Sequence, residues 1–158
     1  MMNSNEPVLR PRLGDRPRTT PSNPHMQLNQ QPIDDKPRQR LRDLLVDLPV
    51  IWGSSMISVP GALALTLPPE LAVGPKEAFM INAEFAHLHP APDYSLHLIL
   101  PLDQAQSAID SGWAEQHPIA RLGYISAGAV MVYAPRDDAE VAIVAQLIRE
   151  SYAYATGD

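Results

Sequence analysis

Four of the five histidines of this chain lie between positions 87 and 117. They are His87, His89, His97 and His117. Imidazole changes its charge near neutral pH, and it is also the commonest metal ligand in proteins. Imidazoles gathered on an apolar sheet are costly to bury without partners. The pattern therefore predicts that this cluster performs chemistry rather than filling space in the core.

Two strand-like stretches carry three of these histidines. Side chains alternate between the two faces of a strand, so His87 and His89 share a face. If the next strand pairs antiparallel after a five-residue loop, 90–94, then His97 lies opposite His87 and Ser95 lies opposite His89. A four-residue loop would turn His97 to the other face. We favour the five-residue loop because it groups the imidazoles.

The histidine cluster has three possible roles. His87, His89 and His97, with or without a carboxylate, can bind Zn, Fe, Mn or Cu. Neutral imidazoles can instead remove the proton of an acidic enol or phenol. In the third role the rings are structural groups, hydrogen-bonded to one another and to Asp93 or Glu84.

The polar and aromatic residues near the histidines are candidate substrate contacts: Glu84, Asp93, Ser95, Trp113, Glu115 and Tyr133. Alternation along the strand places Phe85 on the face of His87 and Glu84 on the opposite face. Trp113 is either a core anchor or one wall of an aromatic pocket. Arg136 follows a predicted strand, where loops often present functional groups. It can clamp a carboxylate or enolate, or it can form an ion pair with a nearby acid.

Periodicity predicts the elements that must position these side chains. Leucines at helical spacing predict a helix over 37–48, and Val141, Val144 and Ile148 predict a long helix that starts near Asp137 or Asp138. Strands are expected at 55–59, 62–67, 77–82, 84–89, 94–100 and 130–134, with a short helix over 103–110 and a loop over 113–117. The order of these elements predicts an α+β fold: a single, mostly antiparallel sheet packed by an N-terminal helix and a long C-terminal helix.

Composition divides the chain into two parts. Residues 1–36 are rich in Pro, Asn, Gln, Ser and Arg and lack an apolar period, so they are predicted to be a disordered tail, whereas 37–158 form the folded domain. Basic residues predominate in the tail, acidic residues predominate in the domain, and the whole chain has a formal net charge of −6. The acidic domain argues against nucleic acid as a partner.

Several classes of site and location are excluded or disfavoured. The chain has no cysteine, so any metal must be held by histidine and carboxylate. No apolar run approaches the roughly 18 residues of a membrane span, and the N-terminus lacks an apolar signal region. A cytoplasmic protein without a membrane partner is therefore expected. The chain also lacks a glycine-rich phosphate loop, a G-x-S-x-G turn and an H-E-x-x-H motif.

Four sequence blocks make the chain resemble the fungal luciferase family and its uncharacterised bacterial relatives, the luciferase-domain proteins. They are Glu84-Phe-Ala-His-Leu-His89, Asp93-Tyr-Ser-Leu-His-Leu98, Gly112-Trp-Ala-Glu-Gln-His-Pro118 and Tyr133-Ala-Pro-Arg136. The resemblance covers approximately 54–157, and with it 37–158 becomes a luciferase-like α+β domain. The N-terminus departs from the family, because the fungal enzymes carry a membrane helix there and this chain has a polar tail.

The resemblance implies an oxygenase that acts on an enolic or phenolic, pyrone-type small molecule with O2 and without an organic cofactor. The fungal enzymes oxidise 3-hydroxyhispidin through a cyclic peroxide that loses CO2 and emits light. By resemblance, His87, His89, His97, His117 and Arg136 are the candidate catalytic residues. The alternatives are a metal-dependent enzyme that uses the same histidines and a non-catalytic module that binds a small molecule or a protein.

Overall fold

The computed structural model describes residues 9–158, whose strands form one six-stranded sheet. The strands are β1 Ile51–Ser54, β2 Leu63–Thr66, β3 Glu84–Leu88, β4 Leu96–Ile99, β5 Ala114–Gln116 and β6 Ala129–Val132. Their order in the sheet is β1-β2-β3-β4-β6-β5, and every neighbouring pair is antiparallel.

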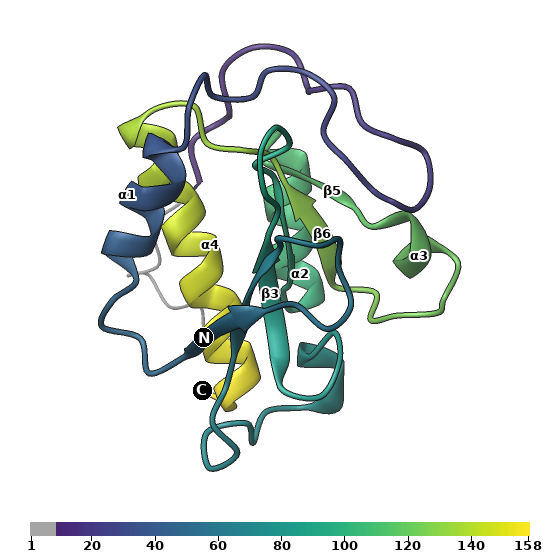
Figure 1. Cartoon of the computed structure of the whole chain (residues 1–158). Coiled ribbons are helices and arrows are strands. Elements are labelled where there is room, and N and C mark those ends of the chain that lie inside the picture. Colours follow the sequence, from purple (N-terminus) through teal and green to yellow (C-terminus); the bar gives the residue numbers. More distant parts are fainter. Residues whose placement is uncertain (1–8) are drawn as a thin grey trace.

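Helices from the beginning, the middle and the end of the chain accompany this sheet. They are α1 Lys36–Leu44, the 3-10 helix η1 Lys76–Ala78, α2 Leu102–Asp110, α3 Pro118–Arg121 and α4 Asp138–Thr156. The first and last helices, α1 and α4, lie side by side on one side of the sheet (Figure 1). The predicted α+β fold, with one antiparallel sheet packed by an N-terminal and a long C-terminal helix, is therefore confirmed. No helix within 9–158 is both long enough and apolar enough to span a bilayer.

The main hydrophobic core lies between the sheet and these helices. Leu41 of α1, Val144 and Ile148 of α4, and Leu98 of β4 are all buried in one cluster. The helical spacing of the apolar residues produces this arrangement, because it gives each helix one apolar face. The first helix is shorter than predicted and ends at Leu44, after which the chain continues in tight turns.

Three predicted elements differ from the structure. The first strand forms at Ile51–Ser54, whereas 55–59 form a turn in which the Ser55 hydroxyl accepts backbone N–H bonds. Residues 76–78 form the 3-10 helix after Pro75, in place of the start of a strand at 77–82. The loop predicted over 113–117 contains the short strand β5. Each element is short, so a few local hydrogen bonds or one edge pairing decide its form.

The N-terminal segment, which we define as residues 9–35, arches over one end of the sheet toward α3, turns back there and crosses the same end again to enter α1 (Figure 1). Gln27 is 2% exposed, and its side-chain oxygen accepts a 2.8 Å hydrogen bond from the backbone N–H of Ala134. The Trp113 indole N–H donates to the backbone oxygen of Arg10 at 2.6 Å. The structure therefore differs here from the predicted disorder of 1–36. The segment is held by polar contacts with the domain, which composition does not reveal; residues 1–8 lie outside the described part.

Candidate functional site

The register of β3 and β4 brings three imidazoles together. His87 lies opposite His97, and the His89 backbone N–H donates to the backbone oxygen of Ser95 at 2.9 Å. This is the predicted register, and it places the three side chains on the same face. His97 lies at the centre, with its ring centroid 5.2 Å from that of His87 and 4.6 Å from that of His89.

A β-bulge places Glu84 beside His87. Leu65 of β2 pairs with Ala86 of β3, and the next residue, Thr66, pairs with Glu84. Phe85 therefore has no pairing partner in β2 and is the extra residue of the bulge. One extra residue reverses the alternation of side chains. The carboxylate of Glu84 therefore accepts a 2.8 Å hydrogen bond from the Nδ1 of His87. Phe85 instead packs in the hydrophobic core. Simple alternation had placed Phe85 on the face of His87 and Glu84 on the opposite face, and both assignments were wrong.

His117 approaches the same centre from the end of β5. Its ring centroid lies 4.5 Å from that of His97. It is also the N-cap of α3, where its Nδ1 accepts a 3.1 Å hydrogen bond from the Ile119 backbone N–H. Pro118 fixes the backbone at this helix start, as is typical for the first helical position.

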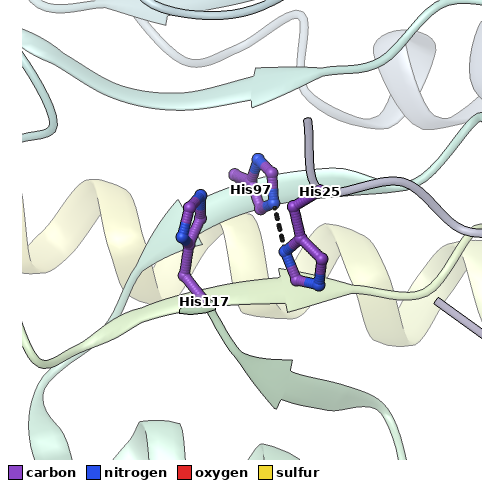
Figure 2. A group of neighbouring side chains, drawn as sticks. All are labelled: His25, His97 and His117. Atoms are coloured by element: carbon purple, nitrogen blue, oxygen red, sulfur yellow. Dashed lines mark hydrogen bonds between the residues drawn. The ribbon is translucent and has the colours of Figure 1, made fainter. Parts of the chain in front are cut away.

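His25 completes the cluster, and sequence analysis did not assign it to the site. Its ring stacks on that of His97 with centroids 5.1 Å apart and an interplanar angle of 22°. Figure 2 shows the rings of His25, His97 and His117 turned toward one another from three separate segments. The only sequence signal for His25 was its residue type, because the surrounding stretch has no periodicity that would place it.

A hydrogen-bonded chain runs through the cluster between two carboxylates. From Glu84 it passes to His87, and His87 Nε2 lies 3.1 Å from His97 Nδ1. His97 Nε2 lies 3.0 Å from His25 Nδ1, and His25 Nε2 lies 2.8 Å from a carboxylate oxygen of Glu115. Every ring of this chain is buried, so each link stands in a medium of low dielectric constant.

The fourth buried imidazole, His89, is oriented by Ser95 and Asp93. His89 Nδ1 lies 2.9 Å from the Ser95 hydroxyl oxygen and 3.3 Å from a carboxylate oxygen of Asp93. The Ser95 hydroxyl donates to Asp93 at 2.5 Å, so its oxygen is free to accept a hydrogen bond from the Nδ1–H of His89. In the neutral ring Nδ1 of His89 therefore carries the proton, and Nε2 presents a lone pair.

Burial and charge favour the neutral form of His87 and His97 and the ionised form of Glu84 and Glu115. Burial, followed by the neighbouring imidazoles, lowers the pKa of His97 well below its usual value. Burial also lowers the pKa of His87, although the Glu84 hydrogen bond opposes this. Burial raises the pKa of Glu84 and of Glu115, but hydrogen bonds from their neighbours outweigh it and leave both pKa values below normal.

The cluster forms the polar part of the wall of a cavity of about 500 Å³. All five histidines line this cavity, together with Asp93. Its apolar wall includes Met26, Ile57, Val59, Met80, Ile119 and Ile125. This combination of a mostly apolar hollow and a few convergent polar groups is typical of small-molecule sites.

Other predicted site residues lie away from the cavity wall. Trp113 is a core residue, 1% exposed, and Tyr133 donates a 2.9 Å hydrogen bond to Glu115. Arg136 does not line the cavity. Its guanidinium pairs with Glu140 and donates to the Leu13 oxygen at 2.9 Å. Of the two roles predicted for Arg136, the structure shows the ion pair, because Glu140 lies one helical turn further along the chain.

Two sets of three imidazoles within 9–158 have the spacing required to hold a metal ion. One is His87, His89 and His97, and the other is His25, His97 and His117; in each set the ligand nitrogens lie within 4.8 Å of one another. The first set is the one that the sequence predicted as possible metal ligands.

Stability is expected to fall as the pH drops from 6.5 to about 4. Burial, followed by repulsion from His25, His87 and His89, lowers the pKa of His117 from 6.5 to about 4. In that range the unfolded chain binds a proton at this position and the folded chain does not, so acidification favours unfolding. Melting temperatures measured against pH for the wild type and His117→Gln test this. The variant should show the weaker pH dependence, and equal slopes would contradict the prediction.

The domain that holds this site matches known proteins. The luciferase-domain family matches residues 82–151. The luciferase of Armillaria mellea is 36% identical over 77 residues, which cover 48% of this chain and 29% of that protein. The luciferase of Neonothopanus nambi is 32% identical over the same length. The chain thus matches less than a third of the length of these curated relatives, and no solved structure matches it. Residues 82–151, which match the luciferase-domain family, carry four of the five clustered histidines, and through them this chain is related to the fungal luciferases.

Proposed function

We propose that this protein is a luciferase-like oxygenase that acts on an enolic or phenolic, pyrone-type small molecule with O2 and without an organic cofactor. The observation that carries the proposal is the set of five imidazoles in the wall of a mostly apolar cavity. The relationship to fungal luciferases supports the same conclusion. A small molecule is the proposed partner, and the cytoplasm is the proposed location.

The cavity suits a flat aromatic substrate in size and polarity. Its volume of about 500 Å³ falls within the range of roughly 300–1,000 Å³ that is usual for small-molecule pockets. Apolar side chains such as Ile57, Met80 and Ile125 can pack on the faces of a ring. The acidic hydroxyl of the substrate would then be directed to the histidines, which are the main polar groups of the wall.

The histidines supply both a proton acceptor and a hydrogen-bond donor. His89 presents its Nε2 lone pair, held in place by Ser95 and Asp93. It accepts the proton of the enol, which leaves an electron-rich enolate that can form a carbon–oxygen bond with O2. His117 accepts from the backbone at Nδ1, so as a neutral ring it carries its proton on Nε2. That N–H can donate to the enolate oxygen, a role that sequence analysis had given to Arg136.

Oxygen uptake tests this function directly. The purified full-length chain is mixed with a panel of hydroxylated pyrones and phenolic acids in an oxygen-electrode cell. We expect uptake with pyrones that carry a free acidic hydroxyl and none with their O-methylated analogues, because the analogues have no proton to remove. Equal uptake with the methylated compounds would contradict the proton-transfer role, and no uptake across the panel would contradict the function.

A further inference from the structure

The chain of hydrogen bonds between Glu84 and Glu115 contains more links than its imidazoles have protons. Four links join the two carboxylates through His87, His97 and His25. Each link needs one proton between its two heavy atoms, and a neutral imidazole carries only one proton. When all three rings are neutral they supply three protons, and one link is left with two lone pairs facing each other.

The partners of the chain restrict where these lone pairs lie. An ionised carboxylate only accepts, so His87 carries its proton on Nδ1, facing Glu84, and His25 carries its proton on Nε2, facing Glu115. The remaining nitrogens of both rings point at His97, which can donate to one of them only. When His97 donates to His25, its Nδ1 lone pair faces the Nε2 lone pair of His87 at 3.1 Å. A cation at this point, either a metal ion or an additional proton, removes the contact between lone pairs.

His89 adds a third lone pair at the same point. Its Nδ1 is engaged by Ser95 and Asp93, so its Nε2 lone pair is free. The possible ligand nitrogens of His87, His89 and His97 lie within 4.8 Å of one another. The 3.1 Å separation between His87 and His97 is close to the distance of about 3.3 Å between nitrogens that each bind a tetrahedral ion at about 2.0–2.1 Å.

The other set of three imidazoles fits a metal less well. Its third member, His117, already uses the Nδ1 lone pair to accept from the Ile119 backbone N–H. In the neutral ring the proton is then on Nε2, so His117 has no free lone pair for a metal. His25 instead links His97 to Glu115: its Nδ1 contacts His97 Nε2, and its Nε2 contacts the Glu115 carboxylate.

We propose that His87, His89 and His97 bind one divalent transition-metal ion through Nε2, Nε2 and Nδ1 respectively. The second nitrogen of every ligand is held by a partner, as is usual for metal-ligating histidines: Glu84 for His87, Ser95 and Asp93 for His89, and His25 for His97. All three ligands line the cavity, which leaves the remaining coordination positions open to a small molecule, as in catalytic metal sites. Imidazole ligands suit Zn, Cu, Fe and Ni, and calcium and magnesium prefer oxygen.

An extra proton is the competing cation. Burial and the surrounding imidazoles hold the pKa of His97 far below its usual value, and burial lowers the pKa of His87. Measuring metal uptake distinguishes a bound ion from an additional proton. With the ion bound, the Nε2 lone pair of His89 would be a ligand and would not accept the enol proton; the positive charge of the ion would instead favour the ionised form of an enolic ligand.

Metal uptake without any substrate tests the proposal. The tag-free, full-length protein is stripped with a chelator and dialysed against Co²⁺ or Zn²⁺, and bound metal is measured by elemental analysis. We expect one ion per chain in the wild type and none in His89→Ala or His97→Ala. His117→Ala, which removes a neighbouring ring that is not a ligand, should still bind one ion. His25→Ala should bind with about 10–100-fold weaker affinity, because it removes a group that orients His97.

Two further readouts keep this test decisive. The visible spectrum of the Co²⁺-loaded wild type should show the intense bands of a four- or five-coordinate nitrogen site, and its melting temperature should rise with metal concentration. Wild-type protein that takes up no metal, or variants that take up as much as the wild type, would overturn the proposal. Because no substrate is present, this result is independent of oxygen uptake: stripped protein that still oxidises pyrones would leave the proposed function standing.

Discussion

Replacing His97 by alanine is expected to slow oxygen uptake with a hydroxylated pyrone by about 10²–10⁴-fold, the usual loss when positioned acid–base machinery is removed. His97 is the ring that contacts all the others, with hydrogen-bond contacts to His25 and His87 and short ring distances to His89 and His117. Its removal separates the two halves of the chain between Glu84 and Glu115. Steady-state oxygen consumption at saturating substrate measures the effect.

Met131→Leu is the matched control for His97→Ala. Met131 lies directly opposite His97 on the neighbouring strand and is also fully buried, but it cannot carry a proton. A swap of similar volume typically costs less than about 1.5 kcal/mol of stability, so this variant should fold and keep its rate. If His97→Ala retained the wild-type rate while remaining folded, the imidazole cluster would have no part in the reaction.

Replacing Trp113 by alanine is expected to lower the free energy of unfolding by about 3–5 kcal/mol, the usual cost of removing a fully buried tryptophan. Trp113 is 1% exposed, packs in the main core and donates its indole N–H to the Arg10 backbone oxygen at 2.6 Å. The change therefore opens a cavity and also releases the N-terminal segment from the domain. Urea unfolding followed by circular dichroism gives the difference.

Trp113→Phe separates these two effects. Phenylalanine keeps much of the packing but has no N–H, so it should lose less stability than alanine while still loosening the contact with Arg10. Limited proteolysis should then cut the N-terminal segment faster in both variants than in the wild type. A loss below about 1 kcal/mol for Trp113→Ala would show that this side chain is not the anchor that its burial indicates.

Local patterns were sufficient where a residue's role depends on its near neighbours in sequence. The spacing of Val141, Val144 and Ile148 predicted the C-terminal helix and its buried face, because helical geometry alone groups them. The five-residue loop after His89 predicted the register that sets His87 opposite His97, because loop length and the two-residue strand period fix the pairing.

Other features depended on contacts that no local pattern encodes. Short strands such as β1 and β5 form only because a neighbouring strand offers hydrogen bonds. The bulge at Phe85 brings Glu84 to His87, and simple alternation predicts the reverse. For Arg136 the sequence left open a substrate contact or an ion pair, and the helix that follows it decides for the ion pair by providing Glu140.

The sequence by itself determined the antiparallel α+β layout, because that follows from the fixed periods of helices and strands. It favoured the convergence of His87, His89 and His97 as one of two registers, and the structure shows that register. Only the tertiary structure decided that His25 joins them and that two carboxylates close the chain of imidazoles. The physical reason is that a segment without an apolar face is positioned by specific polar contacts, here Gln27 to Ala134 and Arg10 to Trp113. Such contacts depend on where distant backbone groups end up after folding.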